Sequence, residues 1–355
     1  MGELLFIHAT NVKGLGAKGV ARSILRAIAR RPMCRGSLVI LPPNSEVRHG
    51  LEDVLTVVDY RRRLPNLISR LLECLWGWRR FKIAPGYAQV WILGDLPIVG
   101  LARQVVLFHQ ANILTKQRFG LNYMKYAISA WIIRRAAHDI ETVVVQTHHV
   151  AQSFRHQFPA LSSKIAVMPL PPPQWVLDAT ARWKPAHPFS PNSKLKLFYP
   201  ASLYEHKNHK LIAELVRSHQ AQSGLEEVVL TIDRQAGCDH PLLKKIGEIG
   251  HGEMLKRYCQ CDAVLFASLV ESSPLVLHEA MTIGIPLVVP DLPYAREIVK
   301  DQGVYFDPLD VDSLIGALDD LRRRLQRQWR PRYELTFTTD AWDQYVDQLI
   351  HLKST

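Results

Sequence analysis

The sequence lacks the long apolar runs and paired cysteines that mark membrane-spanning and disulfide-rich proteins. It has five cysteines in 355 residues, an odd and scattered number, and no stretch reaches the roughly 18 apolar residues that span a bilayer. The charged and then apolar segments of a signal peptide do not precede the first strand-like run. We therefore expect a cytoplasmic protein with free thiols.

Recognisable metal-binding and nucleic-acid-binding motifs are also missing. Cys259 and Cys261 are separated by one residue, which is not the spacing of a zinc knuckle or a thioredoxin-like pair. No Asp-x-Asp pair is placed at a sheet edge. The formal charge is +11, but no zinc-finger or aromatic-rich RNA-binding signature accompanies it. We predict neither a metal site nor a nucleic-acid partner.

Part of the positive charge lies in one amphipathic segment, residues 64–83, LPNLISRLLECLWGWRRFKI. Leu67, Leu71 and Trp78 recur there at helical spacing, and Arg79 follows them. Basic residues beside Trp and Leu favour a helix that lies on anionic lipid headgroups. A core helix with a charged outer edge has the same pattern. We expect contact with an anionic membrane surface, and the core helix remains the alternative.

Short apolar runs alternate with longer amphipathic segments through both halves of the chain. This rhythm is typical of parallel sheets covered by helices on both faces. The runs are residues 4–7, 37–41, 54–58, 90–93, 105–109 and 143–146 in the first half, and 196–200, 228–233, 243–249, 263–267, 286–290 and 304–306 in the second. We predict an α/β protein with two doubly wound, Rossmann-like domains that face each other across a cleft.

Composition suggests where these domains begin and end. Pro and Ser concentrate around residues 168–190, where the apolar rhythm stops. We therefore expect an N-terminal domain at 1–175, a linker at 176–193 and a C-terminal domain at 194–334. Residues 335–355 are expected to form a C-terminal helix that packs back toward the N-terminal domain.

The loop after the first apolar run contains Gly14, Gly16 and Gly19, at the G-x-G-x-x-G spacing of dinucleotide-binding domains. Such a domain needs a carboxylate at the end of its second strand to hold the ribose diol. Here that strand reads SLVILPPNS, and the first acidic residue, Glu46, comes late. The loop is therefore a poor NAD site.

Residues 264–299, VLFASLVESSPLVLHEAMTIGIPLVVPDLPYAREIV, are the most informative part of the sequence. A buried strand leads into a loop that contains Glu271, and Ser273 with Pro274 is expected to begin a helix as N-cap and first residue. Glu279 lies inside that helix. A helix N-terminus at the carboxyl end of a sheet suits a diphosphate, and a carboxylate accepts hydrogen bonds from a ribose or sugar diol.

This segment resembles the Glu-x7-Glu signature of retaining nucleotide-sugar glycosyltransferases, especially glycosyltransferase family 4, which have the two-domain GT-B fold. The resemblance extends through most of the chain. It includes LKLFYPASLYEHKNHKLIAEL, IGEIGHGEMLKRYCQCDAVLFASLVES and GVYFDPLDVDSLIGALDDL in the second half, and VVLFHQANI in the first. It implies an enzyme that moves a sugar from a nucleotide sugar to a hydroxyl group, with retention at the anomeric carbon.

The resemblance also implies a role for individual residues. Glu279 would hold the ribose hydroxyls, and Glu271 would face the donor sugar and its diphosphate. Lys207 would neutralise the diphosphate, and His109 would lie over the sugar from the N-terminal domain. The remaining expected donor contacts are Gly16, Ile249, Ser273 and Leu275.

The resemblance requires no metal and no cofactor besides the nucleotide-sugar co-substrate. From the basic segment 64–83 we expect a lipid-linked, lipopolysaccharide or O-antigen type glycan as acceptor. Such an acceptor would place the protein peripherally on the inner face of the cytoplasmic membrane.

Two departures from the family pattern keep alternatives open. Ala201-Ser202 stands where the family often has Gly-Arg, and Ser273-Pro274 stands where it often has Phe-Gly. The first removes a cation, and the second removes a backbone N–H, because proline has none. The alternatives are a nucleotide-sugar epimerase of the same fold, a catalytically inactive nucleotide-sugar-binding or assembly subunit and, more remotely, an NAD dehydrogenase.

Overall fold

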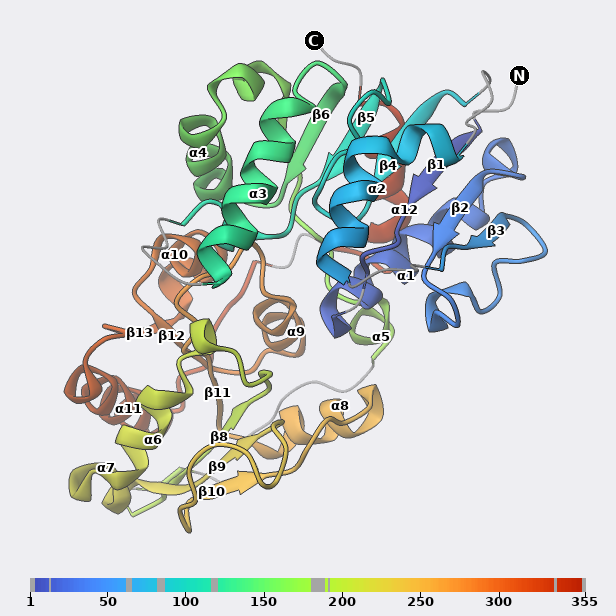
Figure 1. The fold of residues 1–355 in the computed structure, drawn as a ribbon. Coiled ribbons are helices and arrows are strands. Elements are labelled where there is room, and N and C mark those ends of the chain that lie inside the picture. The colour runs from blue at the N-terminus through green and yellow to red at the C-terminus, as the bar shows by residue number, and fades with distance from the viewer. Residues whose placement is uncertain are drawn as a thin grey trace. The chain divides into compact units, whose positions relative to one another are not determined.

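The computed structural model describes residues 4–12, 14–61, 66–81, 87–115, 121–179, 189–190, 192–334 and 337–352. The chain forms two units, each with a parallel sheet and covering helices (Figure 1). Unit 1 comprises Met1–Pro171 and Asp340–Thr355, and unit 2 comprises Pro172–Thr339. The prediction of two doubly wound α/β domains is confirmed.

The boundary between the units differs from the expected one. Unit 2 begins at Pro172, and helix α5 (Gln174–Leu177) crosses the predicted boundary at 175. The reason is packing, because the side chain of Val176 is buried in the core of unit 2. The expected linker at 176–193 therefore starts inside a helix, and most of its remainder lies outside the described residues.

Unit 1 is built on a seven-stranded sheet with the order β3-β2-β1-β4-β5-β6-β7, in which all observed pairs are parallel. The strands are β1 (Leu5–His8), β2 (Leu38–Leu41), β3 (Thr56–Asp59), β4 (Gln89–Ile92), β5 (Gln104–Leu107), β6 (Ile140–Val145) and β7 (Ile165–Val167). The helices are α1 (Leu15–Ala29), α2 (Asn66–Phe81), α3 (Leu121–Arg135), α4 (His148–Gln157) and α12 (Ala341–Ile350). The strand order reverses between β1 and β4, which is where such sheets bind ligands.

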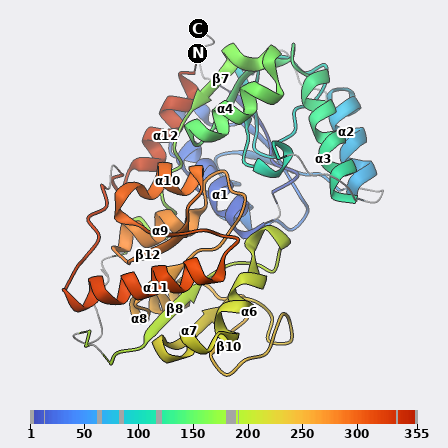
Figure 2. The ribbon, with the colours of Figure 1, turned by 90° about the vertical axis from the view of Figure 1, so that its left-hand side faces the viewer.

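The last helix completes unit 1, although it follows the whole of unit 2 in the sequence. α12 packs on α1 (Figures 1 and 2), and its Trp342 is 1% exposed. Two arginines at the end of α1 form ion pairs with aspartates on the outer side of α12. The guanidinium of Arg30 donates to Asp343 at 2.8 and 3.1 Å, and that of Arg31 contacts Asp343 and Asp347.

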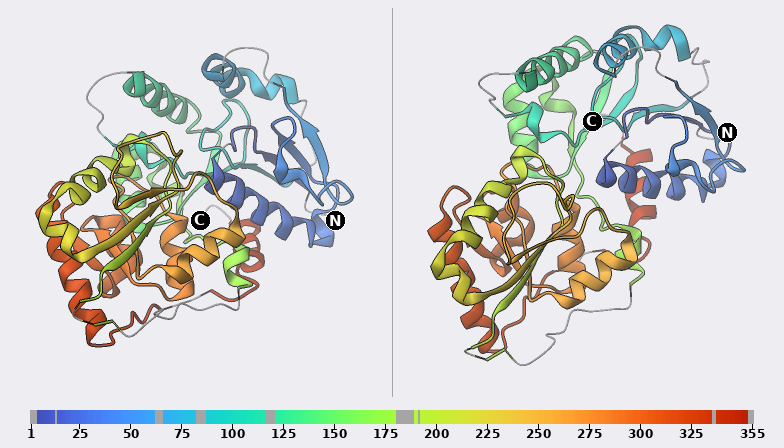
Figure 3. Two further views of the ribbon diagram at one scale, coloured as in Figure 1. Left: turned by 90° about the horizontal axis from the view of Figure 1, so that it is seen from below. Right: turned by 60° about the horizontal axis from the view of Figure 1, so that its bottom comes forward.

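Unit 2 has a six-stranded parallel sheet with the order β10-β9-β8-β11-β12-β13. The strands are β8 (Leu195–Tyr199), β9 (Leu225–Leu230), β10 (Leu243–Lys245), β11 (Ala263–Leu265), β12 (Leu287–Pro290) and β13 (Val304–Phe306). The helices after α5 are α6 (His209–Arg217), α7 (His219–Gly224), α8 (His251–Gln260), α9 (Leu275–Ile283), α10 (Pro293–Val299) and α11 (Val311–Gln326). α6 and α7 pack with α11, and α8 lies on the other side of the sheet (Figures 1 and 3). The strand order reverses between β8 and β11.

Candidate functional site

Two loops at the carboxyl ends of β8 and β11 bring Lys207 and Glu271 together in unit 2. The ammonium group of Lys207 donates to the carboxylate of Glu271, and their side chains are only 18% and 14% exposed. The loops are also joined through their backbones, because Leu269 N donates to the carbonyl oxygen of His206 at 2.7 Å. The hydroxyl of Ser268 donates to the same oxygen at 3.1 Å. These hydrogen bonds between the two loops hold the ion pair in place, at the point where the strand order of the sheet reverses.

The position of Lys207 is set by contacts on three sides. Tyr199, at the end of β8, donates its hydroxyl to the carbonyl oxygen of Lys207 at 2.6 Å. The Nζ atom lies 5.5 Å from the ring centroid of Phe266, within the range of a cation–π contact. Asn208 follows in the left-handed region, with φ of 55°, and its side-chain amide donates to Pro308 O at 2.8 Å.

The charge of Glu271 also acts on neighbouring phenols. Burial, and then the negative charge of Glu271, raises the pKa of Tyr199 and of Tyr294 well above the ordinary value. Both tyrosines therefore stay protonated and act as hydrogen-bond donors. Tyr294 donates to the carbonyl oxygen of Ser268, which ties α10 to the same loop.

Glu279 is a buried carboxyl group with one identified protein partner. It lies in α9 with 7% exposure, and the hydroxyl of Tyr258, at the end of α8, donates to its Oε2 atom at 2.6 Å. Burial raises the pKa of Glu279 to about 7, although the hydrogen bond from Tyr258 acts in the opposite direction. Tyr258 is a site residue that the sequence analysis missed, because no local spacing connects it with α9.

The first turn of α9 differs from its predicted form by one residue. Pro274 is the N-cap, with φ of −70° and ψ of 116°, and Leu275 is the first helical residue. The prediction of Ser273 as N-cap is therefore wrong. The hydroxyl of Ser273 instead lies 2.9 Å from Nε2 of His278, so it does not cap a backbone N–H of the first turn. Neither Pro274 nor Ser273 therefore provides a side-chain cap at the positive end of the helix dipole.

His278 is a second residue that the sequence analysis did not identify. Burial lowers its pKa to about 4, so its imidazole is neutral at neutral pH. A neutral imidazole fixes the hydroxyl of Ser273 without bringing a charge to the start of α9.

Ile249 lies just before α8, and its side chain packs against the edge of the unit 2 core. The neighbouring ring of His251 stacks on Trp175 of α5, with ring centroids 5.0 Å apart and an angle of 9° between the planes. This stack joins α5 to the start of α8. It places an aromatic pair beside Ile249, which the resemblance assigns to the donor contacts.

The other predicted residues, His109 and Gly16, belong to unit 1. His109 follows β5, its backbone N–H donates to Oδ1 of Asp95 at 2.6 Å, and burial lowers the pKa of its imidazole. Gly16 is exposed in the first turn of α1, whose N-cap is Gly14. A Cβ atom at Gly14 would meet nothing within 4 Å, so packing alone does not require glycine there.

A buried polar cluster at the end of β1 was also missed from the sequence. Nε2 of His8 lies 2.6 Å from Oε1 of Glu73 in α2, and the hydroxyl of Thr10 donates to the same carboxylate oxygen. All three side chains are buried. The guanidinium of Arg70, one turn earlier in α2, donates to the carbonyl oxygen of Gly94 at 2.6 Å. α2 is therefore held against the carboxyl ends of β1 and β4.

The burial of side chains in α2 bears on the two interpretations of segment 64–83, a core helix and a helix in contact with a membrane. Cys74 and Leu71 pack into the core of unit 1, as a core helix requires. Ile68 and Trp76 of the same helix are 51% and 49% exposed. The side chains of Leu67, Trp78, Arg79 and Arg80, on which the prediction of membrane contact rests, lie outside the described part of the chain. In the residues that the structure describes, no helix is long and apolar enough to span a bilayer.

Comparison with models of known families gives one match, which lies within unit 2. Residues 242–330 match the model of the family described as glycosyl transferases group 1, a stretch that contains Ile249, Glu271 and Glu279. This part of the chain is a glycosyltransferase domain. A search of the curated proteins finds no match to the sequence.

Solved structures match the whole chain at low sequence identity. Sucrose-phosphate synthase from Thermosynechococcus elongatus is 12% identical with a TM-score of 0.67, and the match covers 98% of each chain. Anabaena HepE in complex with UDP and glucose is 16% identical with a TM-score of 0.64, covering 99% of this chain and 100% of that one. WaaG, a glycosyltransferase involved in lipopolysaccharide biosynthesis, is 13% identical with a TM-score of 0.65, covering 97% and 95%. These similarities show that the two units have the GT-B fold.

Proposed function

We propose that the protein is a retaining glycosyltransferase of family 4 type that transfers a sugar from a nucleotide sugar to a glycan hydroxyl group. The observation that carries the proposal is the arrangement of three residues in unit 2. The Lys207–Glu271 pair stands at the carboxyl ends of β8 and β11, and the buried Glu279 lies in the helix that follows the same loop. A cation beside carboxylates suits a ligand that combines a diphosphate with hydroxyl groups.

In this proposal Glu279 binds the ribose. Tyr258 occupies Oε2, so Oε1 is directed to the ribose hydroxyls. A buried carboxylate gains more from hydrogen-bond donors than an exposed one, because leaving it without them is costly. Two ribose hydroxyls would supply such donors and so favour the ionised form of Glu279.

Lys207 and the start of α9 would stabilise the leaving diphosphate. The ammonium group balances the negative charge that grows as the bond between the sugar and the phosphate breaks, and the first turn of α9 adds the helix dipole. Glu271 holds the ammonium in place and faces the sugar. We propose that this arrangement needs no metal ion, since fixed protein charges take the role of neutralising the leaving group. The positioned acceptor hydroxyl then attacks on the face that the phosphate leaves.

We further propose that the acceptor is a lipid-linked or lipopolysaccharide-type glycan presented at the inner face of the cytoplasmic membrane. Support comes from the basic segment 64–83, from the exposed Ile68 and Trp76 of α2, and from the similarity to WaaG. Flotation with vesicles that contain anionic lipid tests the membrane contact. Binding that weakens with salt supports it, and a protein that stays at the bottom of the gradient at moderate salt contradicts it.

A thermal-shift screen against UDP-, GDP-, dTDP- and ADP-sugars tests the proposed donor class. A ligand at about 100 times its Kd stabilises a protein by roughly 2.7 kcal/mol, so one donor should raise the Tm clearly. The absence of any shift across the panel would contradict the proposal. Turnover of that donor only when acceptor is added separates a transferase from an epimerase, which converts the donor alone.

Two observations favour a second candidate, a nucleotide-sugar-binding subunit without catalysis. Ser202 is exposed and carries no charge, and Pro274 offers no N–H at the start of α9. In such a subunit the donor would bind, but replacing Glu271 with alanine would leave its cellular function unchanged.

A further inference from the structure

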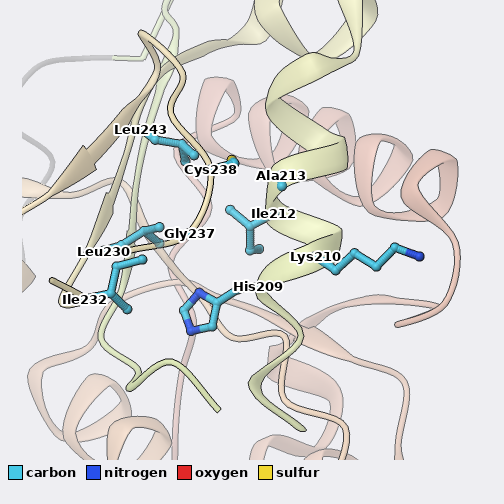
Figure 4. Close-up of a pocket in the computed structure, with 9 residues that line it drawn as sticks. All are labelled: His209, Lys210, Ile212, Ala213, Leu230, Ile232, Gly237, Cys238 and Leu243. Atoms are coloured by element: carbon cyan, nitrogen blue, oxygen red, sulfur yellow. The ribbon is translucent and has the colours of Figure 1, made fainter. Parts of the chain in front are cut away.

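The hollow between α6 and the segment that joins β9 to β10 in unit 2 does not select a ligand (Figure 4). Its walls include the aliphatic side chains of Ile212, Ile232 and Leu243. The Nδ1 atom of His209 beside it is buried, so a molecule in the hollow cannot contact that atom. The charge distribution of unit 1 is more specific.

The net charge of the protein is concentrated in residues 61–135. This stretch holds 13 lysines and arginines but only two acidic residues, Glu73 and Asp95. The whole chain has 44 basic and 33 acidic residues, so the rest of it contains equal numbers of both and is neutral on balance. A charge that is gathered in one part of the chain indicates an anionic partner for that part.

The two acidic residues of this stretch are engaged inside unit 1. Glu73, the only acidic residue of α2, is buried, and its carboxylate contacts His8 and Thr10. Asp95 follows β4, and its Oδ1 atom accepts from the backbone N–H of His109. α3 contains no acidic residue. No acidic side chain of α2 or α3 is therefore exposed.

α2 and α3 form one layer on the same face of the unit 1 sheet. α2 leads from β3 to β4 and α3 from β5 to β6, so both connections run across the sheet in the same direction. Right-handed crossovers then place both helices on the same face, as Figures 1 and 2 show. Cys74 of α2 and Ile132 and Ile133 of α3 belong to one core cluster. The sides of the two helices that face away from the sheet therefore point in the same direction.

This outer side carries large apolar groups on both helices. Ile68 and Trp76 of α2 are about half exposed, and Met124 and Trp131 of α3 are 60% and 49% exposed. Met124 and Trp131 are seven residues apart, which is close to two helical turns, so they lie on the same side of α3. Each helix thus presents one tryptophan and one other apolar side chain to the solvent.

Basic side chains border these apolar groups on α3. Lys125 follows Met124, and Arg134 and Arg135 lie about one turn beyond Trp131. All three basic side chains are exposed. Since α3 has no carboxylate to pair with them, their charges act on a molecule that approaches this side of unit 1.

An anionic lipid bilayer matches this combination of side chains. Tryptophan is enriched at the interface between membrane and water, where its ring meets apolar chains and its N–H stays hydrated. Anionic headgroups attract lysine and arginine side chains near the surface. A nucleic acid duplex would match the charge, but its phosphate backbone offers no apolar surface for Ile68 and Met124.

We propose that α2 and α3 form a single membrane-binding surface, in which Trp76 and Trp131 enter the headgroup layer of an anionic bilayer. The three exposed basic residues of α3 bind its phosphate groups. This inference rests on the membrane location of the acceptor proposed above. It goes beyond that proposal because it assigns half of the contact to α3, which lies outside the amphipathic segment 64–83.

Flotation of the full chain with lipid vesicles tests the contribution of α3. The vesicles contain phosphatidylcholine and phosphatidylglycerol in equal amounts, and vesicles of phosphatidylcholine alone are the uncharged comparison. We expect the wild type to bind the mixed vesicles much more tightly. Replacing Arg134 and Arg135 together with glutamine should lower the binding constant about 30-fold, because each charge near the surface contributes about 1 kcal/mol and about 1.4 kcal/mol is tenfold.

Further variants separate charge from apolar contact. Replacing Arg323 and Arg327 of unit 2, which are also exposed, with glutamine removes the same charge and should leave binding as in the wild type. Trp131→Ala keeps every charge and should weaken binding roughly tenfold, because the half-exposed ring is no longer there to leave water. Trp131→Phe should retain most of the binding. Thermal unfolding checks that each variant is folded.

The outcomes distinguish this inference from the proposed function. It is overturned if either α3 variant, the double arginine variant or Trp131→Ala, floats as well as the wild type, or if the Arg323 and Arg327 control loses as much binding. The membrane contact proposed for α2 would then still stand. Wild-type protein that binds neither kind of vesicle, or that leaves the mixed vesicles for duplex DNA of equal charge, contradicts the membrane location itself. Donor binding in unit 2 is measured separately and is unaffected by these results.

Discussion

The hydroxyl of Tyr258 lies 2.6 Å from Oε2 of Glu279, and both side chains are buried in unit 2. The pKa of Glu279 rises from 4.5 to about 7, chiefly because burial disfavours the carboxylate. The folded protein therefore binds a proton at Glu279 more tightly than the unfolded chain does. Consequently, the free energy of unfolding falls as the pH rises from about 4.5 to 7, and this loss is complete above pH 7.

Glu279→Gln should stabilise the protein at alkaline pH, because glutamine carries no charge to bury and its oxygen still accepts from Tyr258. The gain at pH 8 has an upper bound on the order of 3 kcal/mol, at about 1.4 kcal/mol for each unit of pKa shift. It should be small near pH 5. Urea unfolding at the two pH values measures it, and an equal effect at both would contradict the burial of the ionised group.

Tyr258→Phe should raise the pKa of Glu279 further, because the hydrogen bond from Tyr258 lowers it. If the carboxylate binds the ribose, nucleotide binding in this variant should reach its plateau at a higher pH than in the wild type. Tyr333→Phe is the matched control, since Tyr333 is also a phenol of unit 2 and donates to Ile285 O at 2.8 Å. Equal pH profiles for the Tyr258 variant and the wild type would show that the hydrogen bond does not tune this group.

Glu271→Gln should separate binding from turnover. Glutamine keeps the size of Glu271 but removes the charge that pairs with Lys207, so we expect the kcat of sugar transfer to fall about 100-fold or more. Nucleotide affinity should change much less. Glu205→Gln, which changes an exposed carboxylate in the loop of Lys207, should behave as the wild type. Unchanged transfer by Glu271→Gln would favour the non-catalytic subunit.

Trp342→Ala should destabilise unit 1, since α12 completes it. The indole is 1% exposed, and removing a buried aromatic side chain typically costs about 3–5 kcal/mol. Asp343→Ala removes the ion pairs with Arg30 and Arg31 at the exposed rim and should cost at most about 1 kcal/mol. Chemical unfolding of both variants gives the comparison, and similar losses would mean that charge rather than packing holds α12.

Much of the fold could be predicted from the sequence, because the apolar runs of buried parallel strands are local signals. The runs at 196–200, 286–290 and 304–306 fall on β8, β12 and β13 within one residue at each end. The run at 243–249 was too long, since β10 ends at Lys245 and a loop leads on to α8. Short edge strands carry a weaker pattern, because one side of them remains unpaired.

The candidate site was predictable only in part, because some of its contacts join residues that are not related by any local spacing in the sequence. Glu271 and Glu279 lie in one continuous motif, so their spacing could be recognised in the sequence. Tyr258 meets Glu279 only after α8 and α9 pack together, and no spacing encodes that contact. Ser273 was expected to cap α9 because serine favours that position. His278, one turn later, binds its hydroxyl instead.

Calorimetric titration with nucleoside diphosphates tests the central claim most directly, which is that unit 2 binds an activated sugar through Lys207 and Glu279. The ligand is whichever of UDP, GDP, dTDP and ADP binds the wild type most tightly. Lys207→Met should weaken nucleotide binding at least tenfold, because a loss of about 1.4 kcal/mol of charge pairing corresponds to a tenfold lower affinity. Lys210→Met should leave it unchanged, because the Lys210 side chain is 87% exposed. Equal affinities of the Lys207 variant and the wild type would contradict the account.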